Sequence, residues 1–201
     1  KCQGVVNWEG KEIIPCNYIS IKELKYNTFQ VSSSKGIGLM DTLGRMLIPP
    51  VYAYMQDLRD TNFLQVGRHA GTWGLYDRTG KLIADTLFGG FEEPFGSLIP
   101  FYADFNFRIQ NNSRVYDEKR IGFMDYSGNI LIEPMYDRIN RDYPKKGQIR
   151  LAYGNNYCVI DDKGKLVEGQ FNTVTFQKPT SESTQPSKLK KKKHKKRVRW
   201  L

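Results

Sequence analysis

Two small residues spaced six positions apart recur five times along the chain, and this repeat constrains the fold more than any other sequence feature. The second member of each pair is a glycine, at Gly10, Gly44, Gly80, Gly128 and Gly164. The first member is Gly4, Gly38, Gly74, Gly122 and, in the fifth copy, Cys158. Successive copies start 34, 36, 48 and 36 residues apart. A period of this length predicts a repeat protein whose units bury their apolar faces against one another.

Each copy also has the chemistry of a tight turn. An acid or its amide stands three residues before each second glycine, as Asn7, Asp41, Asp77, Asp125 and Asp161. Such a side chain accepts a hydrogen bond from the backbone N–H two residues further on, and glycine adopts the left-handed conformation that closes the turn. Apolar runs flank the turn, so each copy predicts a β-hairpin. The predicted structural turn residues are Asp41, Gly44, Asp77, Gly80, Asp125, Gly128, Asp161 and Gly164.

A third strand is predicted after each hairpin. An aromatic residue follows the first glycine by fourteen positions, as Tyr18, Tyr52, Phe88 and Tyr136, with Phe171 as the nearest match in the fifth copy. Alternating segments come next: "FQV" at 29, "LQV" at 64, "FRI" at 107, "IRL" at 149 and "VTF" at 174. This alternation indicates strands with one buried face. The second strand ends at prolines, which a sheet edge tolerates, at Pro15, Pro49, Pro50 and Pro134.

We therefore predict an all-β chain in which three-stranded units stack into an open, twisted array. A closed five-bladed β-propeller is the alternative, because the period is close to that of a propeller blade. The units are expected at residues 4–34, 35–70, 71–117, 118–154 and 155–176 of a repeat region 1–176. The first and last units should be the least regular, since each lacks one neighbour. Because the chain begins with Lys1 rather than Met, we expect a fragment or a processed form.

The core of the third copy, "WGLYDRTGK" at residues 73–81, resembles the bacterial WG-repeat family. The resemblance covers residues 1–176. Only Trp73-Gly74 keeps the dipeptide that names the family, and the other copies read "QG", "IG", "IG" and "YC". The resemblance implies β-structured interaction modules without common catalytic residues. We therefore expect a non-catalytic scaffold for protein–protein interaction.

The third copy is the longest, and its extra length is rich in aromatic residues. We assign that length to two longer loops, one before Phe107 and one after Ile109. The first loop carries the candidate partner-binding residues Phe91, Phe95, Phe101 and Tyr102. Exposed rings can fill pockets of a protein partner, or stack on sugars, which makes carbohydrate binding a further alternative. The competing interpretation is that these rings pack into the core beside a longer hairpin.

The net charge of +10 is concentrated at one end of the chain. Residues 188–201, "KLKKKKHKKRVRWL", hold nine Lys or Arg and no acid, so the rest of the chain is close to neutral. We predict a polar linker at 177–187 and a disordered basic tail after it. The candidate polyanion-binding residues are Lys190, Lys191, Lys192, Lys193, Lys195, Lys196, Arg197 and Arg199. Binding of nucleic acid or an anionic membrane is the main alternative function, and a solvated tail without a partner is the other interpretation.

Catalytic chemistry is not indicated. His69 lies in a predicted exposed turn without a nucleophile motif, and Glu92 and Glu93 are adjacent and would face opposite sides of a strand. We expect no enzyme activity, cofactor, metal or small-molecule substrate. The three cysteines are too few and too scattered for a disulfide framework, so the compartment stays open; Cys158 should be a small buried residue.

Overall fold

The computed structural model describes residues 2–59, 61–69, 71–110, 113–142 and 145–170, with residues 104–118 described by their backbone alone. This part of the chain contains eighteen strands and no helix, which confirms the all-β prediction. The predicted linker at 177–187, the basic tail at 188–201, Phe171 and the "VTF" segment lie outside the described residues.

The strands form five antiparallel sheets in chain order, and within each sheet consecutive strands pair. The first sheet is β1 (Gln3–Val6) and β2 (Glu12–Tyr18). The second sheet is β3 (Ser20–Leu24), β4 (Thr28–Ser33), β5 (Gly36–Asp41) and β6 (Met46–Tyr52). The third sheet is β7 (Tyr54–Asp57), β8 (Phe63–Gly67), β9 (Trp73–Asp77) and β10 (Leu82–Phe88). The fourth sheet is β11 (Gly90–Phe91), β12 (Ile99–Gln110), β13 (Ser113–Met124) and β14 (Ile130–Tyr136). The fifth sheet is β15 (Arg138–Asn140), β16 (Gln148–Tyr153), β17 (Asn156–Asp161) and β18 (Leu166–Gly169).

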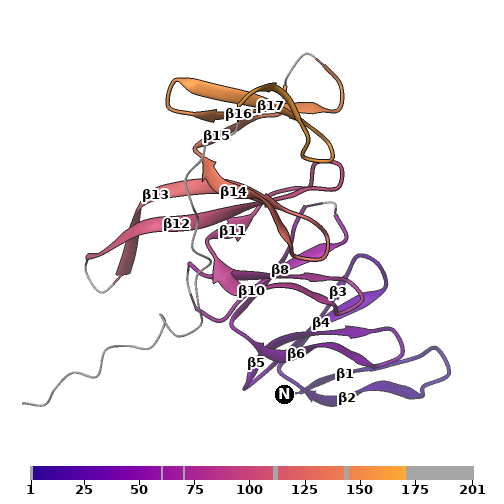
Figure 1. The fold of residues 1–201 in the computed structure, drawn as a ribbon. Helices are drawn as coiled ribbons and strands as arrows, with labels where there is room; N and C mark the ends of the chain where they lie inside the picture. Colours follow the sequence, from indigo (N-terminus) through magenta and orange to yellow (C-terminus); the bar gives the residue numbers. More distant parts are fainter. Residues whose placement is uncertain (1, 60, 70, 111–112, 143–144, 171–201) are drawn as a thin grey trace, which may run out of the picture.

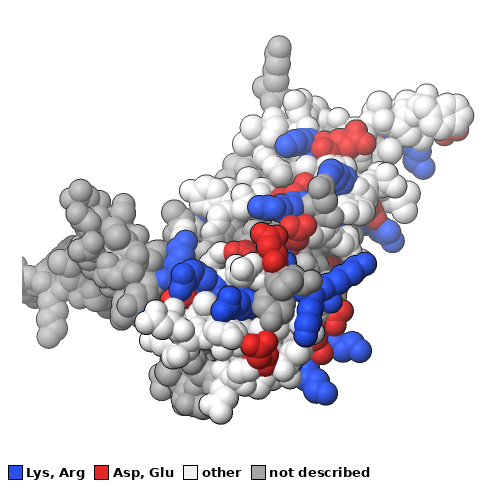
Figure 2. Space-filling model, turned by 90° about the horizontal axis from the view of Figure 1, so that it is seen from above, with Lys and Arg blue, Asp and Glu red and all other residues white. Residues whose placement is uncertain are grey.

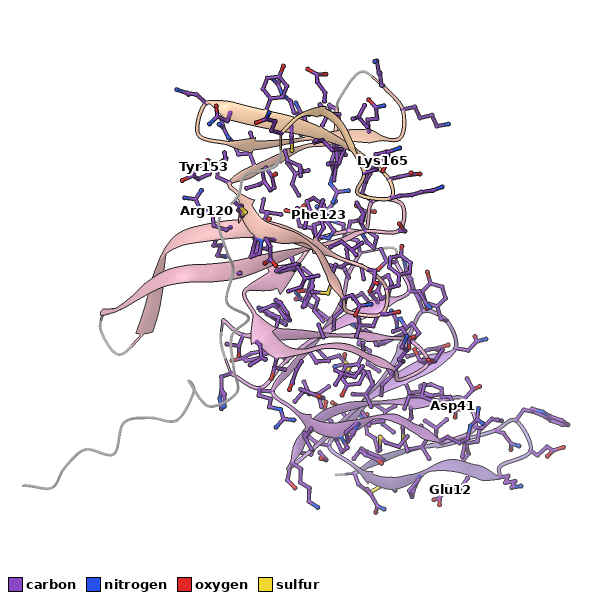
Figure 3. The ribbon with its side chains drawn as sticks, in the orientation of Figure 1. Glu12, Asp41, Arg120, Phe123, Tyr153 and Lys165 are labelled. Atoms are coloured by element: carbon purple, nitrogen blue, oxygen red, sulfur yellow. A yellow bond between two sulfur atoms is a disulfide. The ribbon has the colours of Figure 1, made fainter. Side chains whose placement is uncertain are left out.

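The sheets are stacked one above another, with the first and fifth at opposite ends of the stack (Figure 1). Four clusters of buried apolar side chains fill the four junctions between neighbouring sheets. At the first junction Ile14 packs with Val31 and Met40, and at the last Phe123 packs with Leu151. Figure 3 shows Phe123 inside the stack. Burying such a side chain contributes about 1.5–3 kcal/mol, so each sheet depends on its neighbours for stability. The open array is confirmed, and the described sheets do not close into a propeller.

Every complete sheet contains a short strand that the sequence pattern did not predict. These strands are β3, β7, β11 and β15, and each begins two residues after the recurring aromatic of its copy, as Tyr54 follows Tyr52. Each has only two to five residues, too few to display the period-two alternation on which the other strands were predicted. They form one edge of each four-stranded sheet.

The extra length of the fourth sheet is one long hairpin rather than two loops. Phe101 pairs with Gly122 as Val31 pairs with Gly38, so the strand equivalent to "FQV" begins at Ile99 and not at Phe107. The additional residues extend β12 and β13 together beyond the sheet, where the hairpin projects from the stack (Figure 1). The prediction of two longer loops was therefore wrong. Its cause is that both segments alternate in polarity, so the pattern alone did not fix the register.

Cys2 and Cys16 form a disulfide bridge, with their Cα atoms 5.3 Å apart. The sequence did not predict this bridge, because the two cysteines stand fourteen positions apart. The first hairpin, which pairs Gln3 with Tyr18, brings them opposite each other. Cys158 is fully buried, as predicted.

Candidate functional site: a groove across three edge strands

The predicted turn residues occupy five equivalent hairpin turns. Asp41 Oδ1 accepts hydrogen bonds from the backbone N–H groups of Leu43, at 2.9 Å, and Arg45, at 2.8 Å. The same two bonds, of 2.8–3.0 Å, recur at Asn7, Asp77, Asp125 and Asp161. The glycines that close these turns have φ between 78° and 88°. These positions form a scaffold rather than a reactive site.

Hydrogen bonding within the turns lowers the pKa of three of the turn carboxyl groups. The pKa of Asp125 is lowered, chiefly because the side-chain amide of Asn129 donates to its carboxylate at 2.8 Å. The pKa of Asp161 is lowered by the backbone N–H groups of Lys165 and Lys163. For Asp41, desolvation raises the pKa, but hydrogen bonds from Arg45 and Leu43 outweigh it, so the net shift is downward. In each case the ionised form is the one that the turn stabilises.

The aromatic residues predicted to bind a partner lie within the stack of sheets. Phe91 and Phe101 are buried, and Phe95 and Tyr102 are half-buried against the cluster between the fourth and fifth sheets. The prediction that Phe91 and Phe101 bind a partner is therefore corrected, since neither ring is accessible. The competing interpretation, that the rings fill the core, describes their positions.

Phe91 lies on β11 and Phe101 on β12, and both rings pack in the cluster between the third and fourth sheets. The loop between β11 and β12 packs on the other side, against the fifth sheet. The backbone N–H of Ser97 donates to the carbonyl oxygen of Asp162 at 3.0 Å. Tyr126, in the turn of the fourth sheet, donates its hydroxyl to the carbonyl oxygen of Gly96 at 2.9 Å. The loop thus fills the space between the turns of the two sheets and carries its rings inward.

An open groove of about 930 Å³ runs across the edge strands β7, β11 and β15 and the residues that follow them. The apolar residues at its wall are Leu58, Phe91 and Ile139. The side chains of Leu58 and Phe91 are buried in the core behind the wall, and that of Ile139 is partly exposed. Its charged lining contains both signs and comes from all three strand ends: Asp57, Arg59, Glu92, Glu93, Arg141 and Asp142. The groove is therefore a composite site, which no single repeat could form alone.

A buried glutamine holds the two-residue strand β11 in place. Gln65 of the third sheet accepts a hydrogen bond from the N–H of Phe91 at 3.1 Å and donates one to its carbonyl oxygen at 3.3 Å. The amide of Gln65 thus pairs with Phe91 as a strand backbone would. It fixes the wall of the groove to the neighbouring sheet.

Four of the charged side chains of the groove form ion pairs with one another. Glu92 accepts a hydrogen bond from the Tyr102 hydroxyl and lies 3.4 Å from Arg141 Nη2. Arg141 also donates to the carbonyl oxygen of Glu93 at 2.5 Å, and Arg59 Nη1 lies 3.6 Å from Glu93 Oε2. Burial, together with the bond to Glu92, raises the pKa of Tyr102 above its ordinary value. Exposed ion pairs of this kind contribute about 0–1 kcal/mol, so a partner can replace them at small cost.

Asp57 is fixed from beneath by a buried arginine. The guanidinium of Arg78 pairs with Asp57 and donates to Thr28 Oγ1 at 3.2 Å. Its Cζ atom lies 5.2 Å from the centre of the Tyr26 ring. Arg78 belongs to the turn of the third sheet and Thr28 to the second, so this contact joins two sheets below the rim of the groove.

Charge on the end of the stack is mixed in sign. Figure 2 looks down on the fifth sheet and shows acidic and basic side chains interspersed, without a large field of one sign on this face. His69 is exposed, in agreement with the sequence analysis. Within the described ranges, no group of three or more His, Cys, Asp or Glu residues could hold a metal ion. The same part of the chain has no helix that could cross a membrane.

The groove was not predicted from the sequence, although the sequence contains a signal for it. The groove residues stand four and five positions after the aromatic: Gln56 and Asp57, Glu92 and Glu93, Asn140 and Arg141. Polar residues at these two positions in successive copies mark the ends of the edge strands. These polar pairs did not predict a site, because the edge strands that carry them were not predicted.

The geometry defines a stack of antiparallel sheets built from a repeated chain segment. The family described as WG containing repeat matches this chain at residues 37–66 and 121–151. The protein therefore carries WG-type repeats, which confirms the resemblance of its sequence. Each match runs from the third strand of one sheet into the second strand of the next, as from β5 to β8. No curated protein matches the chain.

Proposed function

We propose that this protein is a non-catalytic scaffold that binds a protein partner in the groove across β7, β11 and β15. The supporting observation is that three sheets contribute charged side chains of both signs to one open surface. Two of these contributions are anchored from below, by Gln65 at β11 and by Arg78 at β7. The binding surface is thus held by buried contacts while its charged ends remain free to exchange partners.

The chemistry of the groove favours a polypeptide segment with charges of both signs. Arg59 is 79% exposed and Glu93 46% exposed at the side chain, so both are accessible. Charges arranged in this way contribute specificity and association rate more than affinity. The partly exposed side chain of Ile139 would supply an apolar contact for the partner.

The carboxylates of the groove are placed for binding rather than for acid–base chemistry. Asp57, Glu92 and Glu93 each lie against an arginine, and Glu92 also accepts a hydrogen bond from Tyr102. Each of these carboxylates is therefore held in an ion pair, and charge pairs of this kind contribute to the selection of a charged partner. This arrangement supports the proposal of a scaffold without enzyme activity.

The test uses two charge reversals at opposite edges of the fourth sheet. Glu93→Arg changes the groove, and Glu133→Arg changes an exposed position on β14. We expect a partner captured from the native host by the unaltered chain to bind Glu133→Arg equally and Glu93→Arg at least tenfold more weakly, measured with the purified partner. Equal binding to both variants would exclude the groove as the site. Thermal unfolding of each variant establishes that the fold is retained.

A second candidate function depends on the basic residues at 188–201, because they carry nearly all of the net charge. Their nine cations favour binding to nucleic acid or to an anionic membrane. Deletion of 188–201 should abolish binding to RNA and to vesicles that contain phosphatidylserine, and leave the partner of the groove bound. Such binding should also disappear at about 0.5 M salt. Binding that survives both the deletion and the salt would exclude this function.

A further inference from the structure

A pocket of about 520 Å³ lies between the turns of the third and fourth sheets, and we call it the turn pocket. Its lining includes Phe63 and Asp77 of the third sheet and Tyr126 in the turn of the fourth. Glu93 lines both the turn pocket and the groove across β7, β11 and β15, so the two surfaces adjoin. A pocket with apolar walls and a few convergent polar groups is a typical place for a ligand.

A buried phenylalanine brings the acid and the tyrosine of the turn pocket together. Phe63 pairs with Asp77 across β8 and β9, and the Tyr126 ring makes a T-shaped contact with Phe63, with ring centres 5.1 Å apart. Opposite residues of a strand pair have Cβ atoms about 4.5–5.5 Å apart, so Asp77 and Tyr126 both adjoin the same ring. The Tyr126 hydroxyl donates to the carbonyl oxygen of Gly96, which holds the ring in place while it stays 43% exposed.

Asp77 has one carboxylate oxygen that its turn does not use. The Oδ1 atom accepts three hydrogen bonds within the turn, of 2.6–3.0 Å. The Oδ2 atom has no hydrogen-bond or ion-pair partner among the described residues. At Asp41 the equivalent oxygen accepts a hydrogen bond from Arg45 at 2.6 Å. At Asp125 it accepts one from Asn129 at 2.8 Å. The carboxylate in the turn pocket can therefore accept a further donor.

The chain itself shows which group fits between a carboxylate and a tyrosine ring. The buried Arg78 contacts both a carboxylate and the Tyr26 ring. Arg120 Nη1 lies 3.8 Å from Asp137 Oδ2, and its Cζ atom lies 4.6 Å from the centre of the Tyr153 ring (Figure 3). A guanidinium suits such a position because it combines directed donors with a flat face that stacks on a ring. The turn pocket offers the carboxylate and the ring, but no described arginine lines it.

The charge of the turn pocket favours a cation. Its lining includes the carboxylates of Asp77 and Glu93 and a single ammonium, that of Lys81. Lys81 is exposed and forms no ion pair within the described part of the chain, so its flexible side chain can turn towards solvent. The adjoining groove likewise holds four acids and two arginines. A polypeptide that spans both surfaces should therefore carry positive charge where it enters the turn pocket.

Given the proposed binding of a polypeptide in the groove, we propose that the turn pocket binds an arginine side chain of that polypeptide. The guanidinium donates to Asp77 Oδ2 and lies against the Tyr126 ring, as Arg120 lies between Asp137 and Tyr153. The backbone of the partner continues past Glu93 into the groove. Arginine is among the residues that most often anchor a protein interface.

The probe is N-acetyl-arginine N-methylamide, titrated into the full chain at about 0.02 M salt, where screening is weak. We expect saturable changes in the amide NMR signals of Phe63, Asp77 and Tyr126. The neutral analogue N-acetyl-citrulline N-methylamide should bind at least fivefold more weakly, because it has no charge to pair with the carboxylate.

Asp77→Asn should weaken binding of the arginine probe about fivefold and keep the turn, since Asn7 makes the same two backbone hydrogen bonds. Asp161→Asn, the same change in a turn that does not line the pocket, is the matched control and should bind as the unaltered chain does.

Tyr126→Leu should weaken binding about threefold, whereas Tyr126→Phe keeps the ring and should bind as the unaltered chain does. Lys81→Gln should strengthen binding about twofold, because it removes the one like charge from the pocket. An anionic ligand would respond to Lys81→Gln in the opposite direction.

Absence of saturable binding would overturn the proposal, as would equal binding of the citrulline analogue. Binding that is insensitive to both Asp77→Asn and Tyr126→Leu would overturn it as well. The probe needs no partner, so arginine binding together with a partner that ignores Glu93→Arg would contradict the proposed function alone. A partner that depends on Glu93 but binds Asp77→Asn unchanged would overturn the arginine site alone.

Discussion

A Cβ atom placed on Gly44 would lie 2.2 Å from the carbonyl oxygen of Ile13 in the preceding sheet. The same relationship joins Gly80 to Leu47, at 2.3 Å, and Gly128 to Ile83, at 2.1 Å. Glycine is therefore required at these turns for two separate reasons. It supplies a positive φ for the turn itself, and it leaves room for the backbone of the neighbouring sheet. The spacing of the stack is set at these contacts.

The stability costs of Gly44→Ala and Gly10→Ala distinguish the requirement for a positive φ from the requirement for space. Both glycines have positive φ, 78° and 81°, but a Cβ on Gly10 would meet nothing within 4 Å. Gly10→Ala should cost about 1–2 kcal/mol, from backbone conformation alone. Gly44→Ala should cost at least about 2 kcal/mol more, because the second sheet must shift away from the first. Urea unfolding measures both, and equal costs would contradict the close approach.

Stability should fall in acid through the turn carboxylates. The pKa values of Asp41, Asp125 and Asp161 are lowered in the folded chain, so near pH 4 the unfolded chain binds more protons than the folded chain. Their contribution is complete above about pH 5 and is lost as the pH falls through the lowered folded pKa values. Urea midpoints between pH 3 and pH 7 should show this decline.

Substitution by Asn isolates the effect of charge, since Asn7 already makes both turn hydrogen bonds. Asp125→Asn should keep the turn and reduce the loss of stability in acid. The reverse change, Asn7→Asp, should increase that loss. An unchanged pH profile in both variants would exclude the turn carboxylates as its source.

Within the ion pair of Arg78 and Asp57, loss of Asp57 should destabilise the fold more than loss of Arg78. The Arg78 side chain is 4% exposed and that of Asp57 31% exposed. Asp57→Leu leaves a buried cation and should cost about 2–4 kcal/mol, whereas Arg78→Met leaves a carboxylate that can reach water and should cost about 1–2 kcal/mol. Arg45→Met, which removes an exposed ion pair, should cost less than about 1 kcal/mol. The reverse order in urea unfolding would contradict this account.

Reduction of the disulfide should loosen the first sheet before the others. The bridge between Cys2 and Cys16 closes a loop for which chain entropy predicts about 3 kcal/mol, and a two-stranded sheet has little stability of its own. Hydrogen exchange of β1 and β2 should accelerate after reduction, with little change in β16 and β17. Cys158 is buried, which raises its pKa, so the native oxidised chain should show no rapidly reacting thiol among its three cysteines. Two rapidly reacting thiols without reductant would contradict the pairing.

The features that could be predicted from the sequence are those with a local chemical cause. A turn needs its acceptor and its glycine within four residues, so Asp41 and Gly44 reveal the hairpin directly. The position of β11 could not be predicted in this way, because two residues have no periodicity and Gln65 holds them from another sheet. Composition could also not decide which way the rings of Phe91 and Phe101 face, since that depends on how β11 and β12 stack on the third sheet.

The groove was missed for a related reason. Its residues come from three copies and gain meaning only when β7, β11 and β15 are placed side by side. The spacing after the aromatic marks Asp57, Glu93 and Arg141 as equivalent, but their different charges conceal this equivalence. A site formed by different residue types at equivalent positions of successive repeats can be recognised only when the stacking of the sheets is known.

Each four-stranded sheet joins the first two strands of one repeat segment to the last two strands of the segment before it, as the match at 37–66 crosses from the second sheet into the third. Cutting the chain at any border between such segments would divide a hydrogen-bonded sheet and leave a half on each fragment. Removing or duplicating one full period, by contrast, leaves every sheet whole wherever the change begins. Arrays of this design can therefore lengthen by internal duplication, or shorten by deletion of a full period, without a preferred breakpoint. Deletion of part of a period, in contrast, leaves a strand with an unpaired edge.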